Sequence, residues 1–165
     1  MDILKLSTDW AKSEVFSSKV VWLFSVIELS AALGFWYLGR TPTAKSFIWP
    51  LLIAGVFLAL VGAGLFLANN PRIVRFQQEY QLDPNTFLQS EIQRTEKSQG
   101  ELALIFRIIP VIIVLSAAVI LVVPGALSRA IAVSVILNAA FLMAVDSNTE
   151  ARNSIYHYEI SAPKK

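Results

Sequence analysis

The sequence FIWPLLIAGVFLALVGAGLFLA, residues 47–68, is an uninterrupted apolar stretch without a single charged side chain. A helix needs about 20 such residues to cross a hydrocarbon core of about 30 Å. Three further apolar stretches of similar length cover residues 20–38, 102–123 and 130–145. A soluble domain of this size shows amphipathic periodicity rather than such long apolar runs. The four stretches therefore predict an all-α integral membrane protein with four spans.

The composition agrees with that class and excludes several others. The chain has 165 residues, of which 55% are hydrophobic, so one membrane domain fits and a second folded domain does not. The absence of cysteine excludes thiol chemistry, and a single histidine leaves little for a metal site. A net charge of +2 does not indicate nucleic acid as a partner. We expect no cofactor and no bound metal.

Lysine and arginine are distributed unevenly between the two sides that four spans would create. The side with the termini and loop 70–101 has ten of them, with Arg107 at its border: Lys5, Lys12, Lys19, Arg72, Arg75, Arg94, Lys97, Arg152, Lys164 and Lys165. The opposite side has three, which are Arg40, Lys45 and Arg129. Because basic loops stay in the cytoplasm, both termini and the middle loop are expected to be cytoplasmic.

The first span is expected to be retained rather than cleaved. The apolar run that begins at residue 20 is too long for the core of a signal peptide, and no small-x-small cleavage site ends it. The sequence has no N-x-Ser/Thr glycosylation acceptor and no lipidation signal. These absences favour a bacterial inner membrane.

Breaks in the apolar pattern predict how the helices are connected. Gly39–Pro42 and Pro124–Gly125 are tight turns, so spans 1 and 2 and spans 3 and 4 are expected to form antiparallel pairs. Asn70-Pro71 and Asp83-Pro84 both resemble an N-cap followed by proline at the first helical position. From residue 84 the helical pattern continues into span 3.

The predicted architecture is an antiparallel four-helix transmembrane bundle with helices 2, 3 and 4 extended into the cytoplasm. A helix over residues 84–123 would be about 60 Å long, twice the hydrocarbon thickness. This architecture divides the chain into five segments. They are an N-terminal cytoplasmic segment (1–19), the first transmembrane hairpin (20–68), a cytoplasmic helical hairpin (69–101), the second transmembrane hairpin (102–145) and a cytoplasmic C-terminal helix and tail (146–165). Acids and amides mixed with Arg94 and Lys97 in the middle segment predict a solvated helix surface.

Glu28 is the one acid near the middle of a span, and Asn138 lies at a similar depth in span 4. An ionisable group at that depth costs a few kcal/mol, so it usually faces the bundle interior or a wet cavity. One interpretation is a proton or cation site with Glu28 and Asn138 as ligands. The other is a protonated Glu28 that hydrogen-bonds Asn138 or Ser134 and holds two helices together.

A charge pair is expected at the cytoplasmic border of the second hairpin. Arg107 enters span 3 and Asp146 leaves span 4 at about the same level. Arg107 has the alternative of extending toward the lipid head groups.

Small residues are spaced four apart on two spans, Gly55, Ala59 and Ala63 on span 2 and Ser30 and Gly34 on span 1. Such faces let helix backbones approach closely. They predict either packing within one bundle or a contact between copies.

The segment Arg152-Asn-Ser-Ile-Tyr-His157 has the spacing R-x4-H. It resembles the catalytic motif of the HEPN ribonucleases, in which an arginine and a histidine on one helix act on RNA. The resemblance covers six residues and implies that Arg152 would orient a phosphate while His157 would act as acid and base. The alternative is a solvated helix with an amphipathic tail.

Three classes of function are compatible with these features. The first is a protein that acts through protein–protein interaction as an accessory subunit, an assembly factor or a toxin-immunity protein. The second is a homo-oligomeric ion channel or pore with Glu28 near the path. The third is a membrane-tethered enzyme, such as a ribonuclease that uses Arg152 and His157. Because no other catalytic motif occurs, we expect a non-enzyme whose partners are the lipid bilayer and another protein or a second copy.

Overall fold

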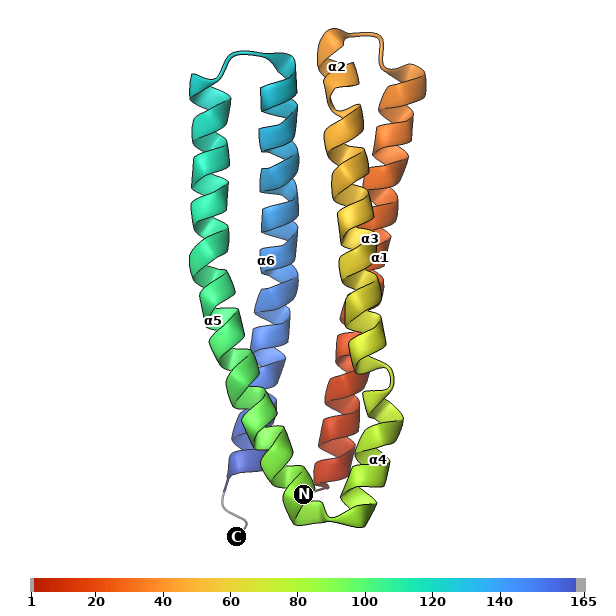
Figure 1. The fold of residues 1–165 in the computed structure, drawn as a ribbon, viewed down its shortest axis with the longest axis vertical. Helices are drawn as coiled ribbons and strands as arrows, with labels where there is room; N and C mark the ends of the chain where they lie inside the picture. The colour runs from red at the N-terminus through yellow and green to blue at the C-terminus, as the bar shows by residue number, and fades with distance from the viewer. Residues whose placement is uncertain (1, 163–165) are drawn as a thin grey trace.

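The computed structural model describes residues 2–162, and all the regular structure in that range is helical. Figure 1 shows the helices, whose bounds are α1 Ile3–Leu38, α2 Pro42–Ser46, α3 Ile48–Asn69, α4 Arg72–Leu82, α5 Pro84–Val122 and α6 Ala126–Ser161. Four helical stretches are long and apolar enough to cross a membrane, with α2, α3 and α4 counted as one. The prediction of an all-α membrane protein with four spans is confirmed at this level. Lys164 and Lys165, which contributed to the charge bias, lie outside the described residues.

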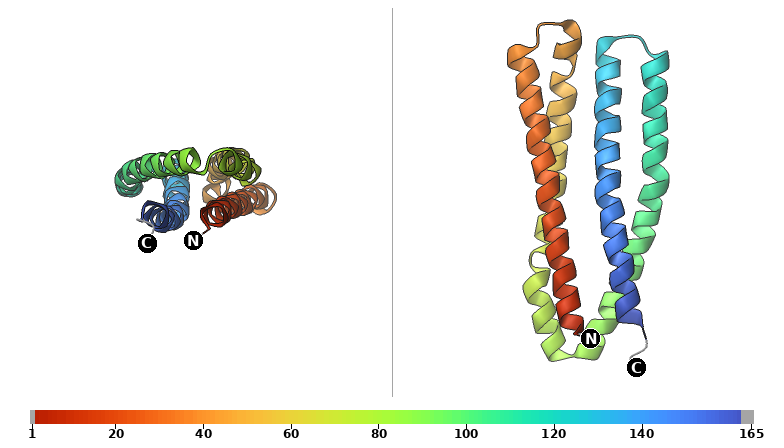
Figure 2. Two further views of the ribbon diagram at one scale, coloured as in Figure 1. Left: turned by 90° about the horizontal axis from the view of Figure 1, so that it is seen from below. Right: turned by 180° about the vertical axis from the view of Figure 1, so that it is seen from behind.

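The long helices associate as two pairs, α1 with α3 and α5 with α6. In the first pair, Trp22 Nε1 donates to the Ala59 carbonyl at 3.1 Å and Ser25 Oγ donates to the Gly55 carbonyl at 2.7 Å. The turns after α1 and α5 lie at one end of the molecule, and the start of α1 and the end of α6 lie at the other (Figures 1 and 2). The two pairs meet where α6 contacts α1, α2 and α3, and where α4 contacts α5.

The described part of the N-terminal segment 1–19 is helical and continuous with the first apolar stretch. α1 begins at Ile3, where Asp2 Oδ1 accepts a hydrogen bond from Lys5 N at 3.2 Å. Side chains on one face of this extension are buried, including Ile3, Trp10 and Glu14. Helix 1 therefore extends beyond its apolar stretch, as the other long helices do.

One of the two expected N-caps forms and the other does not. Asp83 Oδ1 accepts from Asn85 N at 2.9 Å and from Thr86 N at 3.2 Å, so α5 begins as predicted. Asn70 instead has helical backbone angles of φ −61° and ψ −43°, and its N–H donates to Phe66 O. The chain therefore passes from α3 to α4 almost as one helix, interrupted where Pro71 lacks an N–H.

One cluster of buried hydrophobic side chains lies at the end of the molecule where α1 begins and α6 ends. It joins α1, α4, α5 and α6 through buried side chains: Ile3, Trp10, Ala11, Phe76, Phe87, Tyr156 and Ile160. In the apolar part of α5, by contrast, Leu102 and Ile109 are the buried residues. The two helix pairs therefore share a hydrophobic cluster at one end, and much of the apolar surface of the long helices is exposed along the remainder.

Candidate functional site

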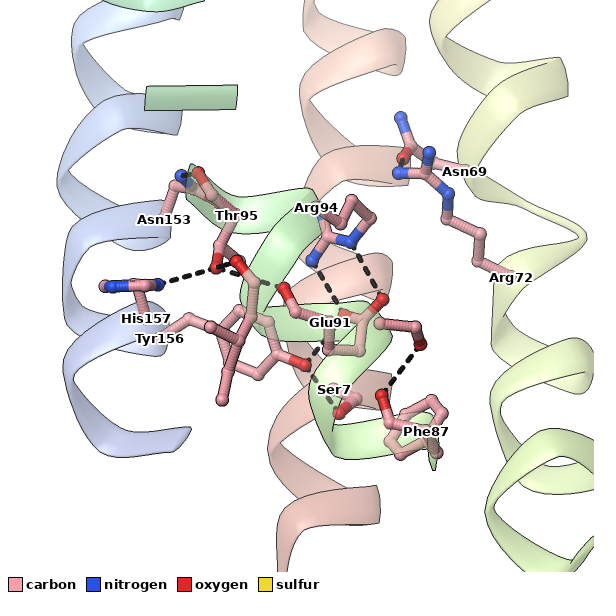
Figure 3. A network of polar contacts seen from close by, with 12 residues as sticks. Ser7, Asn69, Arg72, Phe87, Glu91, Arg94, Thr95, Asn153, Tyr156 and His157 are labelled. Carbon is pink, nitrogen blue, oxygen red and sulfur yellow. Dashed lines mark hydrogen bonds and ion pairs between the residues drawn. The ribbon is translucent and has the colours of Figure 1, made fainter. Parts of the chain in front are cut away.

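A buried carboxylate, Glu91, is the centre of a polar network between α1, α5 and α6 (Figure 3). Arg94 Nε donates to Oε1 at 2.9 Å and Arg94 Nη2 donates to Oε2 at 2.8 Å, which is a bidentate pair. The Tyr156 hydroxyl donates to Glu91 Oε2 at 2.8 Å and lies 2.6 Å from Ser7 Oγ. Three helices far apart in the sequence are therefore joined, α5 to α6 through the Glu91 carboxylate and α6 to α1 through the Tyr156 hydroxyl.

Aromatic rings cover the cationic side of this network. The Arg94 guanidinium lies 3.8 Å from the centroid of the Trp10 ring, which stacks on Tyr156 at 5.9 Å. Burial raises the pKa of the Tyr156 hydroxyl far above its ordinary value, and the Glu91 carboxylate raises it further. Tyr156 therefore stays a neutral hydrogen-bond donor throughout the physiological pH range.

The expectation that Glu91 and Arg94 belong to a solvated surface is wrong. The side chain of Glu91 is 4% exposed and that of Arg94 is 20% exposed. The neighbouring acidic and basic side chains that suggest a solvated helix form a largely buried ion pair instead. Sequence reasoning also missed Trp10 and Tyr156 as partners, because nothing local indicates that α1 and α6 meet at this level.

The two residues of the ribonuclease-like motif have different neighbours. Arg152 Nη2 donates to Glu14 Oε1 at 2.9 Å and to Ser17 Oγ at 2.8 Å, both on α1. His157 Nδ1 lies 2.7 Å from Thr95 Oγ1 on α5. Each side chain joins α6 to a different helix, and the pair does not converge on a shared surface where a phosphate would be cleaved.

The intramembrane residues Glu28 and Asn138 are brought together by α1 and α6. Asn138 Nδ2 donates to Glu28 Oε1 at 2.7 Å and to the Ser134 carbonyl at 2.9 Å. Within residues 2–162, Glu28 Oε2, Asn138 Oδ1 and Ser134 Oγ are buried without a partner. If Glu28 Oε2 carried a proton, this unpartnered acceptor would become a hydrogen-bond donor for one of the other two oxygens. Glu28 is 2% exposed inside one chain, which argues against a pore lined by Glu28 between copies.

The expected pair between Arg107 and Asp146 does not form among the described residues. Arg107 is exposed on α5, whereas Asp146 is half-buried. Burial raises the pKa of the Asp146 carboxyl, and the negative charge of Glu14 adds to this effect. A similar depth by residue count therefore does not bring the two residues together.

The small residues divide into one close contact and several open positions. A Cβ at Gly55 would lie 2.8 Å from Leu29 Cγ, so this residue permits the approach of α1 to α3. Gly62, which the four-residue spacing missed, meets Trp22 in the same way at 2.6 Å.

The other members of the two small-residue faces are less closely packed. Ala59 and Ala63 are half-buried, and Ala59 contributes its carbonyl to Trp22. Ser30 is exposed, and a Cβ at Gly34 would meet nothing within 4 Å. The expected face on span 1 therefore makes no close contact within the chain.

An apolar groove of about 780 Å³ follows α6 between α3 and α5. Its floor includes α6 side chains from Leu127 to Leu142, among them Ser134 and Asn138. Aromatic and aliphatic side chains form the two walls, namely Trp49, Ile53 and Phe57 of α3 and Ile109 and Ile112 of α5. In this part of the molecule α5 packs against α6 but not against α3.

Comparison with family models, curated proteins and solved structures gives no match to this chain. Within the described residues no group of three or more histidine, aspartate or glutamate side chains is arranged to hold a metal ion. The geometry of the groove and of the polar network is therefore the basis for inferring function.

Proposed function

We propose that the chain is a bacterial inner-membrane protein that acts through protein–protein interaction and performs no catalysis. In this proposal its helices cross the membrane as an antiparallel bundle, with both termini, α4 and the first half of α5 in the cytoplasm. The excess of lysine and arginine at that end supports the orientation. The polar network at the same end supports it as well, since a buried ion pair is better accommodated beside water than within lipid.

The groove along α6 is the observation on which the interaction role depends. Its floor extends from Leu127 to Leu142, which corresponds to about 22 Å of helix and most of the hydrocarbon thickness. Its walls are two other helices of the same bundle. We assign to it a transmembrane helix of a partner protein, because helices in lipid associate by close packing of their side chains.

This assignment is compatible with the accessory, assembly and immunity roles. The channel alternative would need copies that surround Glu28, and the ribonuclease alternative would need Arg152 and His157 at one surface. A single transmembrane partner agrees better with a groove that three helices of one chain already form.

Filling the groove with one large side chain is expected to release the partner. Val135 lines the groove and is 37% exposed, so a V135W variant would occupy the space of the incoming helix. Native mass spectrometry of the protein released from its own membranes is expected to show a complex with a different protein. In V135W the bound fraction should fall about tenfold or more, since an overpacked contact costs at least ~1.4 kcal/mol.

A matched control lies on the opposite pair of helices. Leu33 on α1 is 55% exposed and does not line the groove, so L33W should leave the complex intact. Equal loss of partner in both variants, or none in V135W, would contradict the groove. A mass of several identical copies would favour the channel alternative instead.

A further inference from the structure

A second cavity, of about 380 Å³, lies where the apolar stretches meet the polar end of the molecule. Side chains from both pairs of helices line it. Leu65, Leu102 and Val145 are at the ends of three apolar stretches, and Arg72 and Asp146 are just beyond such ends. The cavity therefore has an apolar side toward the membrane and a charged side toward water, as a binding site for an amphiphile requires.

The charged residues that line this cavity are Glu14, Arg72, Arg94, Lys97, Glu101 and Asp146. Four of them have ion-pair partners: Glu14 with Arg152, Arg94 with Glu91, and Lys97 with Glu101. Within residues 2–162, Arg72 and Asp146 have none, and they do not pair with each other. Two opposite, half-buried charges thus border one cavity without meeting.

Within the described residues neither charge has an opposite charge at ion-pair distance, and the Arg72 guanidinium lies 5.8 Å from the centroid of the Trp10 ring. Arg72 Nη1 donates to Asn69 Oδ1 at 2.9 Å, and this is its one side-chain hydrogen bond within the described residues (Figure 3). Burial lowers the pKa of the Arg72 guanidinium, and the positive charge of Arg94 lowers it further. For Asp146, burial and the charge of Glu14 raise the pKa, so its ionised form is also disfavoured. Each group would gain from a ligand of opposite charge.

We propose that this cavity binds the head group of a phosphatidylethanolamine molecule from the cytoplasmic leaflet. The phosphate would accept hydrogen bonds from the free guanidinium nitrogens of Arg72. The primary ammonium would donate to the Asp146 carboxylate, and the acyl chains would leave along the apolar side. A zwitterion satisfies both charges at once, which neither an anionic lipid nor an inorganic phosphate does. This inference requires the proposed membrane placement but no protein partner.

Two other common head groups lack one of the required contacts. The quaternary ammonium of phosphatidylcholine has no N–H with which to reach Asp146, and phosphatidylglycerol has no cation at all. A hydrogen bond to a charged group contributes enough to change affinity about tenfold. The cavity is therefore expected to select phosphatidylethanolamine over both lipids by about tenfold.

Native mass spectrometry of the full chain in detergent micelles, titrated with each dioleoyl lipid separately, tests this selectivity. The natural sequence should retain one phosphatidylethanolamine about tenfold better than phosphatidylcholine. D146N should remove the preference while still binding phospholipid. R72Q should weaken the binding of all three lipids. A68F adds no charge and projects into the cavity from its lining, so it should block all three.

Matched charge changes outside the cavity provide the controls. Asp9 and Arg75 are exposed and do not line the cavity, so D9N and R75Q should behave as the natural sequence does. Circular dichroism of each variant separates lost binding from lost folding. Equal retention of the ethanolamine and choline lipids, or a preference that survives D146N, would overturn the proposal. Displacement of the lipid by equimolar soluble glycerophosphoethanolamine would also overturn it, because the ligand would then not be a membrane lipid.

Discussion

E91A is expected to lose about 3 kcal/mol of stability, because it breaks a buried ion pair by removing one partner. The substitution leaves the Arg94 guanidinium without its carboxylate and the Tyr156 hydroxyl without its acceptor, in a site that is shielded from water. Removing one partner of a buried pair costs about 3–5 kcal/mol, and the lower end applies because Arg94 is still 20% exposed. Urea denaturation in mixed micelles, followed by circular dichroism, gives the free energy of unfolding.

A neighbouring acid on the same helix provides the control for this loss. Glu96 is exposed, so E96A should change the free energy of unfolding by no more than about 0.5 kcal/mol. If E91A were as stable as E96A, the polar network would not be what joins α1, α5 and α6.

G55V is expected to separate α1 from α3 and to destabilise the fold by about 1–3 kcal/mol. The new Cβ would lie 2.8 Å from Leu29 Cγ and 3.3 Å from the Leu29 backbone nitrogen, so rotation of a side chain alone does not make room. The Ser25 hydroxyl, which donates to the Gly55 carbonyl, would lose its acceptor as the helices move apart. Thermal unfolding in detergent measures the resulting fall in Tm.

The same substitution further along α3 separates packing from helix propensity. A Cβ at Gly64 meets nothing within 4 Å, so G64V introduces the same β-branched side chain into open space. G64V should leave Tm close to that of the natural sequence. Equal losses in G55V and G64V would mean that valine disturbs the helix itself rather than the contact with Leu29.

Hydrophobicity is sufficient to predict the spans and much of the helix organisation. The charge-free stretch 47–68 lies almost entirely within α3, and Asp83 caps α5 as expected. The contact between Glu28 and Asn138 is also accessible from the sequence, since two polar residues at one depth in lipid have few other partners. In these cases the lipid environment restricts the alternatives, which is why local sequence is informative.

The polar network is not predictable by the same reasoning. Ser7 and Tyr156 are separated by 149 positions, and no local pattern indicates that their helices meet. The error on Arg107 and Asp146 has a related cause. Counting residues along a span gives a depth, but each residue also rotates the side chain by about 100° around the helix. The depth of a residue along a span therefore follows from the sequence. The direction in which its side chain points depends on how the helices pack.

The proposed membrane placement, on which the lipid site depends, requires that α4 lies in the cytoplasm and that the turn after α1 lies on the opposite side. The chain has no cysteine, so single cysteines at exposed positions report sidedness directly. With a membrane-impermeant maleimide applied to spheroplasts, T43C should be labelled at once and Q81C only after the membrane is permeabilised. Labelling of Q81C in intact spheroplasts, with T43C protected, would contradict the proposed membrane placement and with it the lipid site.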